Sequence, residues 1–334
     1  MSRRSLLGAA IAALLLPVSA VPAGARAVPP QPVVHSRGVA WLTPIRVGQV
    51  VGVATVRRTY VATGAGRWQV AAAVPGFRTT VRPRTLTSTH SGQRVRLQLV
   101  FVRRTARLGA WSRGLVRFEG SSSLRARVAL RPVGALVPTV DRLVGTSGDE
   151  TFPVRGGVDR TVPVSVSGLV QPWTFFPVLT AGASHFRCLP AGPATRALRV
   201  DLSASDPTAD LDLFVYAATN CDPGTRGLLV ASSHRTRSTE RVVMLRPDPG
   251  AYIVEVRADD TGTGSDVTGI LQLIDVEAGA GWGDLAVSPN PVPLRTGRTS
   301  MLHLTWSGLP TEHFWFGLVQ PAGAPAPMWV DLLT

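Results

Sequence analysis

Short runs in which apolar and polar residues alternate recur along the chain from residue 53 onward. Clear examples are 53–61, 95–102 and 124–130. Alternation with a period of two gives a strand one apolar and one polar face. The 33 glycines and 27 prolines fall between the apolar runs, as turn residues do. Long amphipathic helical patterns are absent, so the pattern predicts an all-β protein of tandem antiparallel β-sandwiches.

The length of 334 residues suits two or three such domains. We expect domains at 28–138, 139–278 and 279–334, with a linker at the first of these boundaries. The last segment is short for an independent sandwich, so we expect it either to dock onto its neighbour or to be a reduced unit.

The N-terminus has the pattern of an export signal. Arg3 and Arg4 precede a 13-residue apolar stretch at 6–18, which is too short to span a bilayer. The small residues Ala25 and Ala27 have the cleavage-site spacing, so we expect removal of 1–27 and a secreted or cell-wall-associated product. The two arginines also resemble a twin-arginine signal, and the export route stays open. No later segment is long and apolar enough for a transmembrane helix.

Cys188 and Cys221 are the two cysteines of the chain. An even count in an exported protein favours a disulfide. The alternative is a reactive thiol, but neither cysteine is accompanied by a partner His or Asn motif.

The first domain resembles a known family in the order of its motifs. A strand carries Arg58-Thr59-Tyr60-Val61, the turn Pro75-Gly76 follows, and a hairpin begins with the strand 114–120. This succession resembles the fibronectin type III-like domain that follows the catalytic domain in many subtilisin-like serine peptidases. The resemblance covers about a third of the chain and implies a fibronectin III or Ig-like sandwich.

The second domain resembles the bacterial pre-peptidase C-terminal domain, a jelly-roll sandwich appended to secreted proteases. The run ADLDLFVY at 209–216 and the strand AYIVEV at 251–256, which follows a Pro-Gly turn, carry this resemblance. The segment LTWSGLPTEHFWFGLV at 304–319 resembles the final, Ig-like domain of some actinobacterial subtilisin-like peptidases. Together these resemblances imply the non-catalytic C-terminal region of such a peptidase.

The resemblance makes a subtilisin-type triad the first chemistry to seek. Asp260-Thr261-Gly262 has the letters of the Asp motif but does not follow an apolar strand. Thr299-Ser300-Met301 partly matches the Ser motif, but Arg298 and Leu302 stand where Gly and Ala are required. No His is followed by Gly-Thr, so the base that would activate the serine is missing. We expect the chain not to be an enzyme.

Metal binding has one candidate site. Asp259, Asp260 and Asp266 lie in a Gly-rich acidic loop that offers oxygen ligands for Ca²⁺. The spacing is not that of an EF-hand, and the alternative is a solvated turn whose Asp residues favour turn geometry. Asp210 and Asp212 share a strand face, which we interpret as a polar face. The six His residues show no zinc-ligand spacing, and we expect no other cofactor.

Charge is distributed unequally between the domains. All 35 basic residues are Arg, and the formal net charge is +14. Residues 28–138 contain 18 Arg and one acid, Glu119, whereas 139–278 contain 12 Arg and 17 acids. Codon bias in a GC-rich genome explains the preference for Arg over Lys. It does not explain the near absence of acids from one domain, which indicates that the domains have different partners.

The Arg-rich domain is therefore the candidate binding site. Guanidinium groups suit phosphate and carboxylate, and aromatic stacking platforms for sequence-specific nucleic-acid binding are absent. We predict an accessory protein that binds anionic cell-envelope polymers. The alternative is a detached C-terminal part of a subtilisin-like peptidase that acts with, or is left over from, a separately encoded catalytic chain. The candidate residues include pairs on one strand face: Arg57, Arg58, Arg82, Arg84, Arg94, Arg96, Arg103, Arg104, Arg125 and Arg127.

Overall fold

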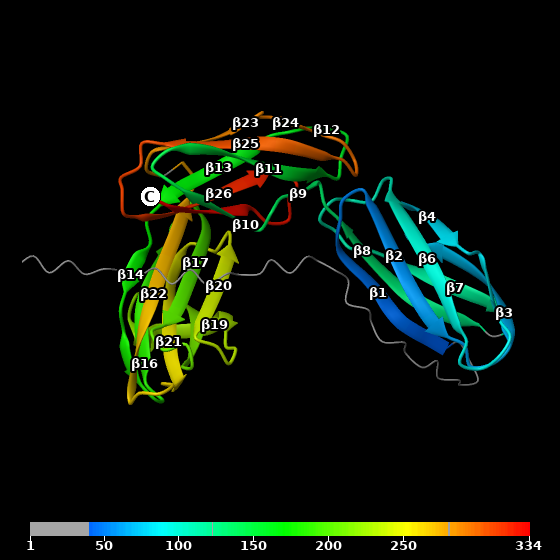
Figure 1. Cartoon of the computed structure of the whole chain (residues 1–334), viewed down its shortest axis with the longest axis horizontal. Helices are drawn as coiled ribbons and strands as arrows, with labels where there is room; N and C mark the ends of the chain where they lie inside the picture. The colour runs from blue at the N-terminus through cyan, green and yellow to red at the C-terminus, as the bar shows by residue number, and fades with distance from the viewer. Residues whose placement is uncertain (1–39, 122, 280) are drawn as a thin grey trace, which may run out of the picture.

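The computed structural model describes residues 40–334, apart from 122 and 280. Within this range the chain forms 27 strands and one short 3₁₀ turn, η1 (Pro223–Thr225). The strands build three β-sandwich modules (Figure 1), so the predicted all-β fold of tandem antiparallel sandwiches is confirmed. The predicted signal peptide lies outside the described residues. No helix among the described residues is long and apolar enough to cross a membrane.

The first module consists of a five-stranded sheet packed on a three-stranded sheet. The sheet orders are β1-β8-β7-β3-β5 and β2-β6-β4, and β1 pairs with β8 in parallel. Leu99, Phe101 and Val116, which are fully buried, lie in the core between the sheets. The strands are β1 (Ala40–Val50), β2 (Val53–Val61), β3 (Gly66–Ala73), β4 (Phe77–Arg82), β5 (Thr85–Ser88), β6 (Arg94–Arg103), β7 (Ser112–Gly120) and β8 (Leu124–Pro132).

The second module is built from two separate stretches of the chain, and we call it the split module. Its sheets have the orders β10-β27-β26-β13 and β23-β25-β11-β9, with a small β12-β24 ribbon at one side. Its strands are β9 (Ala135–Leu136), β10 (Val140–Val144), β11 (Gly148–Gly156), β12 (Arg160–Val162), β13 (Val164–Val170), β23 (Asp284–Ser288), β24 (Val292–Leu294), β25 (Thr299–Ser307), β26 (Phe314–Pro321) and β27 (Met328–Leu333).

The third module lies in the sequence between the two halves of the split module, and we call it the inserted module. Its sheets are β14-β22-β17-β20, with β15 also on β22, and β16-β21-β18-β19. The strands are β14 (Trp173–Phe175), β15 (Val178–Thr180), β16 (Ser184–Ala191), β17 (Thr195–Ala204), β18 (Asp210–Ala218), β19 (Arg226–Ser233), β20 (Thr239–Leu245), β21 (Gly250–Asp260) and β22 (Asp266–Glu277).

This arrangement differs from the domain boundaries expected from the sequence. Strand β11 pairs with β25 along eight residues, and β13 pairs with β26. Phe152 and Val154 from the first stretch share one core with Leu302 and Leu304 from the last. Residues 139–170 therefore belong with 284–333. The last segment is half of a sandwich, which explains why its length is too short for a whole one.

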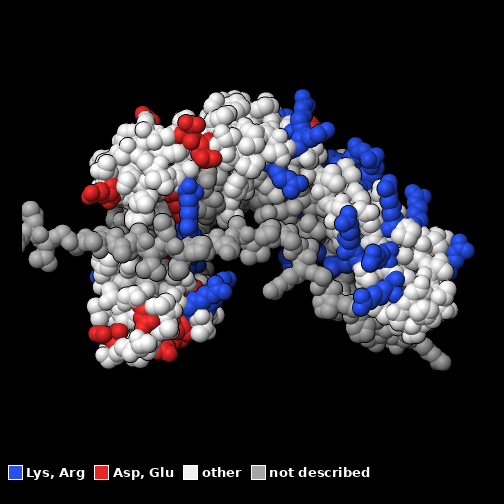
Figure 2. Space-filling model, viewed as in Figure 1, with Lys and Arg blue, Asp and Glu red and all other residues white. Residues whose placement is uncertain are grey.

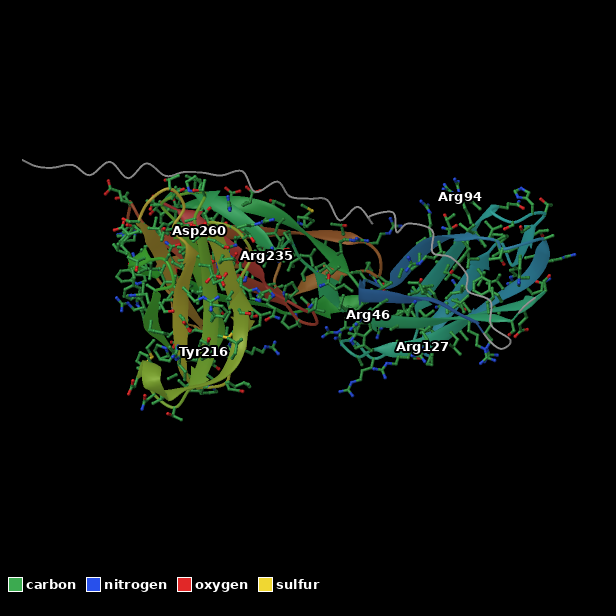
Figure 3. The ribbon with its side chains drawn as sticks, turned by 90° about the horizontal axis from the view of Figure 1, so that it is seen from below. Arg46, Arg94, Arg127, Tyr216, Arg235 and Asp260 are labelled. Atoms are coloured by element: carbon green, nitrogen blue, oxygen red, sulfur yellow. A yellow bond between two sulfur atoms is a disulfide. The ribbon has the colours of Figure 1, made fainter. Side chains whose placement is uncertain are left out.

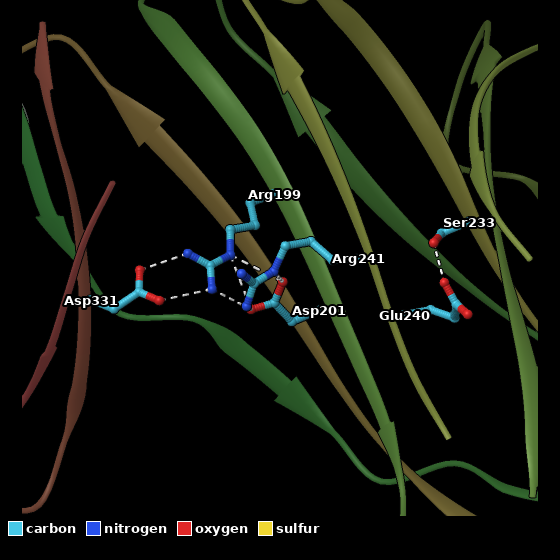
Figure 4. Close-up of polar contacts among 6 residues, drawn as sticks. All are labelled: Arg199, Asp201, Ser233, Glu240, Arg241 and Asp331. Atoms are coloured by element: carbon cyan, nitrogen blue, oxygen red, sulfur yellow. Dashed lines mark hydrogen bonds and ion pairs between the residues drawn. The ribbon is translucent and has the colours of Figure 1, made fainter. Parts of the chain in front are cut away.

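A buried ion-pair network joins the inserted module to the split module (Figure 4). The Arg199 side chain, 2% exposed, donates to both carboxylate oxygens of Asp201 and to both of Asp331, at 2.6 to 3.0 Å. Its guanidinium carbon lies 4.9 Å from the Phe316 ring centre and 5.2 Å from that of Trp329. Apolar side chains of β22 and β26 pack beside it. The two modules are therefore held in one orientation.

The predicted disulfide between Cys188 and Cys221 is present. It ties β16 to the turn that precedes η1, and it fits an extracellular protein because such bonds persist in oxidising compartments.

Replacing both cysteines with serine should lower the free energy of unfolding by ~3–4 kcal/mol, because the bond closes a loop of 33 residues and restricts the unfolded chain. Urea unfolding of the double variant, with the reduced wild-type protein as a matched control, measures this loss. A change below about 1 kcal/mol in both samples would contradict the expectation.

Candidate anion-binding surface

The outer face of the β2-β6-β4 sheet carries a cluster of arginines. Leu97, Leu99 and Phe101 of β6 point into the core, so the alternate residues of β6 point outward. The strand register then places the outward side chains of β2 and β4 beside them. Five exposed arginines result, and we call them the three-strand face: Arg57, Arg78, Arg82, Arg94 and Arg96.

These arginines are close neighbours in register. Arg57 and Arg82 both lie opposite Gln98, on either side of β6, so the three residues form one row across the sheet. Arg94 and Arg96 lie two residues apart on β6, which separates them by about 7 Å. No Asp or Glu occurs in β2, β4 or β6. Like charges without counter-charges on a sheet face repel one another, which favours an external anion.

The opposite face of the module is also basic. Arg125 of β8 lies directly opposite Arg117 of β7, and Arg127 lies opposite Leu115 on the same outer face. Figure 3 shows Arg94 projecting from one side of the module and Arg46 and Arg127 from the other. This face differs from the three-strand face because Glu119 also points outward from β7 and Arg46 stacks 4.5 Å over the Trp111 ring.

The remaining predicted arginines lie elsewhere. Arg58 is opposite Leu97 and so points inward, with its buried Nε atom lacking a hydrogen-bond partner among the described residues. Burial raises the pKa of the neighbouring Tyr60 to about 12, although the charge of Arg58 opposes this. Arg103 donates from Nε to the Ala106 carbonyl at 2.8 Å. Arg84 and Arg104 are exposed beyond the ends of β4 and β6.

In the space-filling view, basic side chains gather on the first module, whereas acidic ones lie on the other two (Figure 2). In the inserted module several arginines are paired with carboxylates. Arg226 pairs with Glu255, Arg241 with Asp201, and Arg257 with Asp212 and Asp259. The sequence asymmetry thus separates the three-strand face, whose strands carry no acidic residue, from the inserted module, where several arginines are paired.

The predicted calcium ligands are engaged in other contacts. Asp259 pairs with Arg257 at 2.7 Å, and Asp260 accepts a hydrogen bond from the Gly262 backbone. Asp266 lies exposed at the start of β22. Among the described residues, no group of three or more His, Cys, Asp or Glu side chains is placed to hold a metal ion. Asp212 lies on the outer face of β18, opposite the core residues Leu211 and Leu213, and is buried there beside Arg257. Burial and nearby Asp259 raise its pKa.

The fragments that resemble triad motifs lie in different modules. Asp260 ends β21 of the inserted module, whereas Ser300 lies on β25 of the split module. The Ser300 hydroxyl donates to the Pro293 carbonyl at 2.6 Å.

One titratable group has a pKa raised toward the neutral range. Burial raises the pKa of Asp275 to about 6, although the Thr195 hydroxyl hydrogen-bonds to it. The native protein therefore binds a proton at a higher pH than the unfolded chain, and this group destabilises the fold above pH 6 but not near pH 4.

Replacing Asp275 with Asn should stabilise the protein at pH 7, and the gain should shrink as the pH falls toward 4. The full shift corresponds to ~3 kcal/mol, which solvent screening at this half-buried site reduces to ~1 kcal/mol. Chemical unfolding at four pH values measures it, with Asp266→Asn as an exposed control. The same gain at pH 4 and pH 7 would contradict the assignment.

Sequence reasoning missed Arg78 on the three-strand face and Arg199 at the module interface. Arg78 lies four residues before Arg82 on β4, a spacing that could have shown their common face. Nothing in the sequence pairs Arg199 with Asp331, because 132 residues separate them.

Comparisons with known proteins leave the family open. No family model and no curated protein matches this chain. Similar solved structures include the secreted serine protease VesC from Vibrio cholerae, at 11% identity and a TM-score of 0.22, covering 70% of this chain and 49% of that one. Tripeptidyl peptidase 2 matches at 11% identity and a TM-score of 0.25, and the match covers 84% of this chain and 28% of that one.

The CupB2 chaperone from Pseudomonas aeruginosa matches at 8% identity and a TM-score of 0.23, and the match covers 69% of this chain and 97% of that one. The chain thus spans about half the length of VesC and less of the second peptidase. None of these three likenesses assigns a function to the chain.

Proposed function

We propose that this chain is an exported, non-catalytic binding protein whose first module binds anionic polymers of the cell envelope through the three-strand face. The observation that carries the proposal is the set of five exposed arginines on that face, without an acidic residue on its three strands. Each guanidinium can form paired hydrogen bonds with a phosphate or carboxylate group.

The geometry suits a repeating polyanion better than a single ion. Neighbouring strands lie about 5 Å apart and alternate residues along a strand about 7 Å apart, so the arginines offer several charges in a regular array. A linear polymer with charged groups at comparable intervals can contact several of them at once. Release of its counter-ions then drives binding.

The test is retention of the purified protein by cell wall with and without its teichoic acid, across a salt series. We expect binding that requires the anionic polymer and weakens steeply as salt rises, because each phosphate contact releases counter-ions. Binding that is independent of salt, or absent at low salt, would contradict the proposal.

The alternative is that the chain is the detached C-terminal part of a subtilisin-like peptidase. The order of sandwiches supports it, since a fibronectin type III-like sequence precedes one resembling a pre-peptidase C-terminal domain. On this view the partner is a separately encoded catalytic chain. Co-elution of the two purified proteins in size-exclusion chromatography, at physiological salt, would favour this alternative.

A further inference from the structure

A cavity of about 590 Å³ lies where the three modules meet. Arg131 and Val133 contribute from the end of the first module, and Ser167 and Gln320 contribute from the split module. Arg196 and Arg246 contribute from the inserted module. A volume of this size is within the range of sites that bind small organic molecules.

Three arginines line this cavity, and none of the described residues that line it is Asp or Glu. Arg131 donates from Nε to the Gly109 carbonyl at 2.8 Å, which leaves its terminal nitrogens for other partners. Within the part of the chain that the structure describes, Arg196 and Arg246 form no ion pair. The cavity therefore concentrates positive charge without an internal counter-charge.

The backbone of Arg246 is held in an unfavourable conformation. Its φ is +52°, which lies in the left-handed region that residues other than glycine rarely adopt. Its N–H donates to the Arg196 carbonyl at 2.8 Å, so the two arginines lie on adjacent ends of β17 and β20. Glycine would adopt this conformation without strain. Residues in such strained conformations cluster at binding and active sites, and the Arg246 side chain lines this cavity.

The walls of the cavity are fixed to one another. The Gly134 N–H donates to the Gly323 carbonyl at 2.9 Å, and the Gly157 N–H donates to the Gly134 carbonyl at 2.8 Å, which holds the segment between β8 and β9 against the split module. Arg199 and Asp331 fasten the inserted module to the split module. The site is thus organised before a ligand arrives, which reduces the entropy cost of binding.

We propose that this junction cavity binds a multiply charged organic anion, with phosphate or carboxylate groups on a carbon body. The arginines contact the anionic groups, and Ser167 and Gln320 offer further polar contacts. Leu108, Leu245 and Pro325 provide apolar surface for the carbon body. This site is separate from the three-strand face, and the proposal does not depend on polymer binding by that face.

The test is isothermal titration calorimetry of the full protein at low and physiological salt with three probes: fructose 1,6-bisphosphate, citrate and inorganic phosphate. We expect one site per chain for the bisphosphate or for citrate, and the stronger of the two identifies the anionic group. Inorganic phosphate should bind at least tenfold more weakly, because it lacks a body to fill the cavity. Failure of both organic probes to bind at low salt would overturn the proposal.

Variants locate the site. Arg196→Ala and Arg246→Gly should each weaken binding of the organic probe roughly tenfold or more, because each removes charged hydrogen bonds. Arg246→Gly should leave the melting temperature unchanged or higher, since glycine relieves the strained φ, so lost binding would not reflect unfolding. The matched control Arg237→Ala, exposed in the β19–β20 turn, should bind normally. Equal weakening in Arg237→Ala would show non-specific charge attraction and overturn the proposal.

Discussion

Replacing Arg199 with Ala is expected to lower the free energy of unfolding by ~3–5 kcal/mol, because it leaves the poorly solvated Asp331 without its cation and leaves Asp201 with only the more exposed Arg241. Asp201 and Asp331 are each 16% exposed. Arg199 also packs against the rings of Phe316 and Trp329. Urea unfolding followed by tryptophan fluorescence measures the loss, since Trp329 lies at this interface.

The control for this variant is Arg241→Ala. Arg241 binds the same Asp201 at 2.6 Å, but its side chain is 44% exposed. We expect a loss below about 1 kcal/mol, as is usual for exposed ion pairs. Similar losses in the two variants would contradict the view that burial makes Arg199 important.

The same network makes stability depend on pH in a definite direction. Burial alone would raise the pKa of Asp201, but hydrogen bonds and charge from Arg199 and Arg241 outweigh it and hold the pKa below its usual value. A carboxyl group with a lowered native pKa stabilises the fold above its unfolded pKa of about 4 and loses this contribution in more acidic solution. The Arg199 variant should therefore lose less stability below pH 4 than at pH 7.

Reversing three charges on the three-strand face should abolish most polymer binding. Changing Arg57, Arg94 and Arg96 to Glu lowers the net charge of this face by six units. The affinity for teichoic acid at 50 mM salt should then fall by at least roughly 100-fold, because attraction becomes repulsion. The slope of log affinity against log salt should become shallower. All three side chains are exposed, so the fold should be retained.

A triple reversal in another module controls for net charge. Arg142, Arg155 and Arg160 are exposed on the split module, and changing them to Glu alters the total charge by the same amount. This variant should keep binding within a few-fold of the wild-type protein. If both triple variants lose binding equally, overall charge rather than the arrangement on β2, β4 and β6 governs the interaction.

Local sequence patterns predicted local geometry well. Alternation in 94–103 placed Arg94 and Arg96 on one strand face, and the structure has them both exposed there. The adjacent pair Arg57 and Arg58 cannot share a face for the same reason, and the burial of Arg58 Nε follows. Which strands pair is a non-local property, so the sequence did not show that Arg57 and Arg82 lie on either side of β6.

The insertion of one module within another could not be predicted from the sequence either, because it too depends on which distant strands pair. Thr151 and His303 lie opposite each other in the β11-β25 pair, although 152 residues separate them. Each half of the split module has ordinary strand periodicity, so no local signal marks either half as incomplete. The junction cavity was equally invisible, since its three arginines come from strand ends in different parts of the sequence.

The nesting of one module inside another sets an order of assembly during synthesis. The first and inserted modules each have all their strands once residue 277 has been made. The split module then still lacks β23 to β27, so the apolar faces of β11 and β13 have no partner strands from its second half. A ribosome that stops in this interval releases a chain with two closed sandwiches and several unpaired, aggregation-prone strands. The split module can therefore close only after residues 284–333 have been made.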